Sequence, residues 1–222
     1  AYDQKQGKRK QDGIFYTPEY ITRYIVRQAV GGWLQERRRE AGLDQLPELT
    51  DEDRATIRIG AGNKLVQPSR AVQRHIAAWE QYAQALEGIR VLDPACGSGA
   101  FLNEAFGYLL REGQHVNQEL AALRAGQFKV FDLDRHILQH NLYGVDLNPE
   151  SVDITRLSLW LQTANPGKPL TSLDHSIRCG NSLISDPAVA GPRAFDWQAA
   201  FPEVFEKGGF DVVIGNPPYV RA

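Results

Sequence analysis

The sequence predicts an α/β protein in which a helical N-terminal part precedes a doubly wound parallel sheet. Apolar residues recur at helical spacing from Ile21 onward. A short apolar run closed by an acid and a proline, as is typical of buried parallel strands, occurs at 89–94, and further strand candidates lie at 142–146, 176–181 and 210–216. Helical patterns separate these runs at 100–112, 132–140 and 149–163. Strand and helix therefore alternate through the second half of the chain.

The composition indicates a folded protein of the cytoplasm. The 222 residues are 42% apolar, 23% charged and 9% aromatic, which excludes a disordered tail, a collagen-like repeat and a coiled coil. The net charge of −2 excludes the class of strongly basic proteins that bind nucleic acid over their whole surface. Cys96 and Cys179 are too few for a disulfide scaffold or a zinc cluster. No apolar run is long enough to span a membrane or serve as a signal peptide.

The N-terminal part is predicted to contain two main helices. Thr17, Pro18 and Glu19 are expected to be the N-cap, first-turn proline and first-turn acid of the first helix. Residues 41–68 read as loop with one possible strand at 56–60, and 69–86 as the second helix, which Gly88 ends. We therefore expect a helical part over 1–88 and a sheet domain over 89–222.

A glycine turn follows the first predicted strand, in VLDPACGSGAFL (91–102). Gly97 and Gly99 allow the backbone to approach a ligand, and the next helix begins with free amides. Leu102 stands where a dinucleotide fingerprint has a third glycine, so a shorter nucleoside ligand fits better. The alternative is a tight turn without a ligand, and the preceding DPAC tetrapeptide weighs against it.

Asp146 closes the second predicted strand, in YGVDLNPESV (143–152). A carboxylate at this position can accept two hydrogen bonds from ribose hydroxyls. It lies 47 residues after Gly99, whereas the dinucleotide pattern expects about 20, and a helical excursion at about 113–140 accounts for the excess. The alternative is that Asp146 only stabilises the start of the following helix.

The last predicted strand ends in GNPPYV (215–220). Two consecutive prolines remove backbone donors, so the turn presents the side chain of Asn216 and the carbonyl of Pro217 as acceptors for an amino group. Tyr219 adds a flat face on which a planar group can stack. The tetrapeptide alone is also compatible with a plain turn at a strand end.

Two other groups of side chains receive structural interpretations. His136 and His140 lie one helical turn apart, but no third ligand accompanies them, so no metal site is predicted. Leu157, Trp160 and Leu161 share helical spacing and are predicted to lie in the core.

The order of these motifs resembles the amino methyltransferases that use S-adenosylmethionine, specifically the DNA adenine-N6 enzymes. GIFYTPEYI (13–21) resembles their first motif, and the segment 140–161 is most similar to large fused restriction-modification enzymes and methyltransferases of phage-exclusion systems. The cofactor motifs precede NPPY, which is the gamma-type order. The resemblance implies a partial Rossmann-like class I methyltransferase sheet.

The resemblance also implies roles for individual residues. Tyr16 and Thr17 would contact the methionine end of the cofactor, and Asp146 the ribose. Asn181 stands where the family often has an acid that contacts the cofactor's adenine amino group. The implied cofactor residues are Tyr16, Thr17, Asp93, Ala95, Gly97, Gly99, Asp146, Leu147 and Asn181. The implied target-binding residues are Asn216, Pro217, Pro218 and Tyr219.

The implied partner is double-stranded DNA from which a target adenine is flipped. Alternatives are a methyltransferase for RNA guanine or protein glutamine, and a non-catalytic cofactor-binding scaffold of a defence complex. Only four strands are counted where the family has seven, so we expect a fragment that is inactive alone. The rest of the sheet, a recognition domain and any nuclease would lie elsewhere in the parent protein. The strand 210–216 would then be an exposed edge that promotes self-association.

Overall fold

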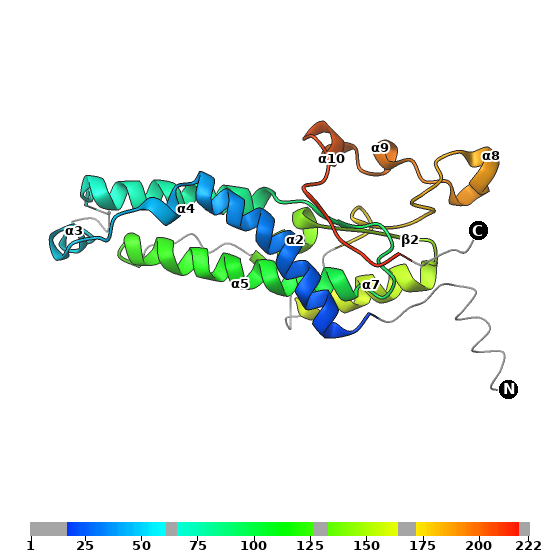
Figure 1. The fold of residues 1–222 in the computed structure, drawn as a ribbon, viewed down its shortest axis with the longest axis horizontal. Coiled ribbons are helices and arrows are strands. Elements are labelled where there is room, and N and C mark those ends of the chain that lie inside the picture. Colours follow the sequence, from blue (N-terminus) through cyan, green and yellow to red (C-terminus); the bar gives the residue numbers. More distant parts are fainter. Residues whose placement is uncertain (1–16, 61–65, 127–132, 164–171, 218–222) are drawn as a thin grey trace.

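The computed structural model describes residues 17–60, 66–126, 133–163 and 172–217, and it forms an elongated molecule (Figure 1). Its N-terminal part is helical, as predicted. The elements here are α2 (Glu19–Glu40), η1 (Leu43–Gln45), α3 (Asp51–Ala55) and α4 (Arg70–Gly88). Ser69 caps α4 by accepting a hydrogen bond from the amide of Val72.

A parallel sheet follows, which confirms the predicted fold class. Its strands are β1 (Val91–Asp93), β2 (Leu142–Asp146), β3 (Ile177–Cys179) and β4 (Val212–Val213). Their order is β3-β2-β1-β4, and β1 pairs in parallel with both β2 and β4. Within the described residues β4 is an edge strand, as expected. Crossover helices are what allow consecutive strands to run in parallel.

Helices cover both faces of the sheet. In Figure 1, α5 and α7 lie on one side of the strands, and α8, α9 and α10 lie on the other. The elements concerned are α5 (Ala100–Leu123), α6 (Leu133–His136), the π-helical η3 (Ile137–Asn141), α7 (Pro149–Gln162), α8 (Pro187–Ala190), η4 (Gly191–Arg193), α9 (Trp197–Ala200) and α10 (Pro202–Glu206). Among the described residues, no helix joins the length and the apolar character that crossing a membrane requires.

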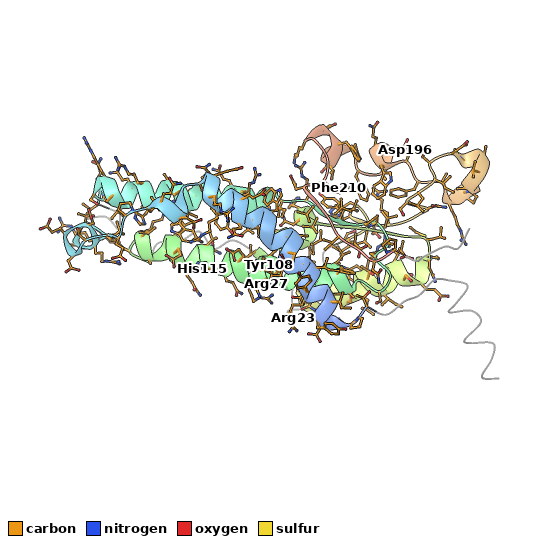
Figure 2. All side chains as sticks on the ribbon, viewed as in Figure 1. Arg23, Arg27, Tyr108, His115, Asp196 and Phe210 are labelled. Carbon is orange, nitrogen blue, oxygen red and sulfur yellow. The ribbon has the colours of Figure 1, made fainter. Side chains whose placement is uncertain are left out.

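Two apolar clusters hold these layers together. The larger one joins α2, α4 and α5 to one face of the sheet, and it includes Val26, Trp79, Leu102 and Leu142. The smaller one, on the other face, is built from aromatic rings. Its members include Tyr143 and Phe201, and the partly buried Phe210 packs against it, with the ring centroids of Phe201 and Phe210 5.6 Å apart. Figure 2 shows Phe210 on the side of the strands that faces α10.

Several predicted details differ from the structure. The N-cap of α2 is Pro18, not Thr17, since the carbonyl of Pro18 accepts the first helical bonds. The segment predicted as loop and strand contains the helix α3, which begins with a capping box formed by Thr50 and Asp53. No strand forms over 56–60, where Ile59 makes an isolated bridge.

The predicted core position of Leu157 and Leu161 is wrong, since these side chains are 54% and 68% exposed. Helix α7 instead buries the stripe that contains Val152, Thr155 and Leu159. Because that stripe alone faces the sheet and α5, the neighbouring leucines point away from the core. Trp160, which lies between Leu157 and Leu161 in the sequence, is partly buried.

Candidate active site

The glycine turn between β1 and α5 is held from two sides. Gly97 and Gly99 have φ values of 53° and 83°, a left-handed conformation that favours glycine. The amide of Gly97 donates to Oδ2 of Asp146 at 2.8 Å, and Oγ1 of Thr155 donates to the carbonyl of Gly97 at 2.8 Å. The turn is therefore fixed by the end of β2 and by α7. The Gly97 amide is therefore engaged within the protein.

Asp146 supports the start of α7, which is one of the two roles that its sequence position suggested, and its contact with a ribose remains a prediction. Its Oδ1 accepts the amide of Asn148 at 2.9 Å, which supports the start of α7, while Oδ2 accepts the amide of Gly97. Each carboxylate oxygen has two lone pairs, so each keeps one for a further donor. The side chain is partly exposed, and the adjacent Leu147 is 45% exposed. A ligand can reach both residues.

Asp93 is a deeply buried acid of the site, and its pKa is raised. The residue is 1% exposed, and its Oδ1 accepts the amide of Ala95 at 3.1 Å. Its Oδ2 is buried and has no hydrogen-bond partner among the described residues. Burial, together with the charge of Asp146, raises the pKa of Asp93 to about 7. A buried carboxyl oxygen without a partner is a site at which a cation or a donor would be stabilised.

Asp93 also contacts the end of β4. A Cβ atom placed on Gly215 would lie 2.8 Å from Oδ1 of Asp93, so the backbone can approach this closely only at a glycine. The next residue is Asn216. The glycine turn and the NPPY turn, which are far apart in the sequence, therefore meet around Asp93.

The N-terminal motif reaches the same place. Nδ2 of Asn216 donates a hydrogen bond to Oγ1 of Thr17 at 3.3 Å. Thr17 lies just before α2, which packs against β4. Asn216 and Pro217 are exposed. Tyr16, Pro218 and Tyr219 lie outside the described residues, so their predicted roles remain predictions.

Asn181 lies beyond the end of β3 and has local partners. Its amide donates to the carbonyl of Arg193 at 2.7 Å, and its Oδ1 accepts the amide of Leu183 at 3.1 Å. The amide of Gly180 donates to the carbonyl of Asp146 at 2.9 Å, which places this turn beside β2. The predicted contact between Asn181 and a cofactor remains a prediction.

The structure thus gathers the described candidates at the carboxyl edge of one parallel sheet. In open sheets of this type, ligands bind in the crevice outside the carboxyl ends of the strands. The sequence interpretation missed Thr155, which holds the glycine turn. The only available signal was a polar residue three positions after Val152, on the buried stripe of α7.

Metal-ligating residues do not accumulate at this edge. Within the described ranges, no group of three or more His, Cys, Asp or Glu side chains could hold a metal ion. The rings of His136 and His140 are 4.8 Å apart. Burial, followed by the neighbouring His136 and His175, lowers the pKa of His140. Nε2 of His136 lies 2.9 Å from the carbonyl of Glu87.

Comparison with known proteins shows that the C-terminal segment of the chain, which carries part of the site, matches a known protein family. Residues 140–222, which include β2, α7 and the NPPY turn, match the family described as Eco57I restriction-modification methylase.

Similar proteins include a Methanocaldococcus jannaschii protein provisionally named as a type II restriction enzyme and methyltransferase. It is 30% identical over 190 residues, 78% of this chain and 14% of that protein. The adenine-specific methyltransferase BrxX of Escherichia coli is 27% identical over 145 residues, 65% of this chain and 10% of that protein. The adenine-specific methyltransferase PglX of Streptomyces coelicolor is 30% identical over 165 residues, 60% of this chain and 12% of that protein. The chain thus matches only 10% to 14% of the length of these relatives.

Proposed function

Because residues 140–222 belong to the Eco57I restriction-modification methylase family, we propose that this chain is the cofactor-binding and catalytic part of a DNA adenine-N6 methyltransferase. The observation that supports it best is the meeting of Thr17, Asp93 and Asn216, which come from three distant segments. The methyl donor is S-adenosylmethionine. The enzyme acts in restriction-modification or phage defence, together with further domains of the same protein.

The residues present fit this cofactor. The unpaired buried oxygen of Asp93 suits a ligand that carries positive charge, because a cation would offset the cost of burying the carboxylate. The free lone pairs of Asp146 suit ribose hydroxyls, and the exposed side chain of Leu147 suits the face of a base. Thr17 and Tyr16 would hold the carboxylate end, with Ala95, Gly97 and Gly99 along the backbone cradle.

The bound cofactor supplies a methyl group already activated by its sulfonium charge. Asn216 and Pro217 accept the two N–H bonds of a flipped adenine through a side-chain oxygen and a carbonyl oxygen. These acceptors orient the amino nitrogen and stabilise it as it loses conjugation with the ring. Tyr219 stacks on the base, next to Pro218. No residue of the chain has to remove a proton before transfer.

The test is product analysis with the complete protein. Mixed-sequence DNA, RNA and a glutamine-containing protein are each incubated with radiolabelled S-adenosylmethionine, and the methylated nucleoside or residue is identified after digestion. N6-methyladenine is expected. Methylated cytosine, methylated RNA or methylated protein glutamine would refute the substrate assignment, and the absence of cofactor binding would refute the enzyme assignment.

Asn216→Ala should abolish methylation while leaving cofactor affinity nearly unchanged, because Asn216 contacts the target. Asn117→Ala is the matched control, since this asparagine lies on α5 beside the cavity between α4 and α5. The control should retain full activity. Equal activity in both variants would remove Asn216 from the mechanism.

A further inference from the structure

The hydrogen bond between Thr17 and Asn216 joins residues 199 positions apart. It is held in place by the packing of α2 against β4. Asp93 lies so close to Gly215 that the backbone before Asn216 is constrained. The side-chain amide of Asn216 is exposed and can still rotate.

That rotation matters for the proposed reaction. A carboxamide has an acceptor oxygen on one side and an NH₂ donor on the other, and only the oxygen can accept a bond from the target amino group. In the structure the NH₂ group donates to Thr17. The oxygen is therefore turned away from Thr17 and kept for another partner. A flip of the amide would present two donors to the target amino group and prevent binding.

The hydroxyl of Thr17 can enforce this orientation, because it has one proton to donate and two lone pairs that accept. A hydroxyl that donates its proton to a carboxylate can only accept from Asn216. It then selects the orientation in which NH₂ faces Thr17. A hydroxyl without such an acceptor could equally donate to the Asn216 oxygen.

We propose that Thr17 is a positioning residue that couples the carboxylate of the bound cofactor to the orientation of the Asn216 amide. This inference rests on the proposed function, and it adds that the bound cofactor fixes the amide orientation that the structure shows. The contact is local and needs no movement of the sheet.

The test uses the complete protein and a duplex in which 2-aminopurine stands next to the adenine that the protein methylates, so that the target keeps its amino group. The fluorescence of 2-aminopurine rises when the neighbouring adenine leaves the stack, and it is followed within the first turnover, before methylated product accumulates. S-adenosylmethionine should increase flipping in the unaltered protein and in Thr17→Ser, which keeps the hydroxyl. In Thr17→Val, which keeps the shape and loses the hydroxyl, the increase should fall roughly tenfold.

A second probe separates coupling from a merely structural role. Decarboxylated S-adenosylmethionine lacks the carboxylate, so it should bind and yet fail to increase flipping in the unaltered protein. Urea unfolding of the cofactor-free Thr17→Val variant verifies that the fold is intact. An equal increase with the decarboxylated cofactor, or full coupling in Thr17→Val, would overturn the inference and leave the proposed function standing. No response to S-adenosylmethionine in the unaltered protein would also overturn the inference, while product analysis decides the proposed function.

Discussion

Asp93 combines deep burial with a carboxyl oxygen that no described residue satisfies. In the unfolded chain an aspartate ionises near pH 3.8, whereas burial raises the pKa of Asp93 in the folded protein to about 7. Between these two pH values the folded state holds a proton that the unfolded state has lost. The contribution of Asp93 to stability therefore falls as the pH rises through this window.

Asp93→Asn should remove that pH dependence. Relative to the unaltered protein, the free energy of unfolding of the variant should increase between pH 4 and pH 8, by about 4 kcal/mol at most. Urea unfolding followed by circular dichroism at several pH values measures this difference. A difference that stays constant with pH would show that Asp93 is ionised in the folded protein throughout.

Asp146→Ala should weaken the binding of S-adenosylmethionine by about 1.5 to 3 kcal/mol, since hydrogen bonds to a charged group are lost. The variant also loses the acceptor of the Gly97 amide, so the turn itself is less fixed. Titration calorimetry measures the affinity. Asp153→Ala, an exposed acid of α7, is the control and should bind as the unaltered protein does. Unchanged affinity in Asp146→Ala would remove this residue from the cofactor site.

At the scale of elements, the start of α5 depends on the backbone of Gly99. Its φ of 83° is strained for other residues, and an added Cβ would lie 3.0 Å from Cγ2 of Thr155. Gly99→Ala should therefore lower the free energy of unfolding by about 1 to 3 kcal/mol.

Gly88→Ala provides the matched comparison, because Gly88 is the last residue of α4 and an added Cβ meets nothing within 4 Å. It should be neutral or stabilise by up to about 1 kcal/mol. Thermal or urea unfolding of the two variants measures their free energies of unfolding. Equal effects at both glycines would mean that the turn is not constrained as the structure indicates.

Elements were predictable from the sequence where their signals are local. The first strand lies in a short apolar run closed by an acid and a proline, and the cap of α4 at Ser69 follows from one residue type at one position. The stripe that α7 buries could not be read in this way, because Leu157 and Leu159 are equally apolar and only the position of the sheet distinguishes them. The bond between Thr17 and Asn216 depends on packing across the whole chain.

At the scale of the whole molecule, the larger apolar cluster crosses the division expected near residue 88. It includes Val30 and Tyr82 from the helical part and Val91 and Ile177 from the sheet. Burial shared across a boundary makes the two sides cooperative, since neither keeps its core when the other unfolds. The division into 1–88 and 89–222 remains a prediction of sequence alone.

We expect the described parts to unfold in one transition. Of the four tryptophans, Trp79 belongs to the larger cluster and Trp197 packs against the aromatic cluster, where its Nε1 donates to the carbonyl of Ser182 at 3.1 Å. In two variants, each keeping only one of these two and phenylalanine at the other three positions, the urea midpoint from tryptophan fluorescence should coincide with the midpoint from circular dichroism of the same variant. A fluorescence midpoint that departs from the circular-dichroism midpoint would support two independent units.

The contact between Thr17 and Asn216 has a consequence for connectivity. Thr17 and Asn216 lie within hydrogen-bond reach although 199 positions separate them along the chain, so the segments that carry the first and the last motif are neighbours in space. The packing of α2 against β4 maintains this proximity. The order of the motifs along the gene therefore does not determine their arrangement at the sheet edge.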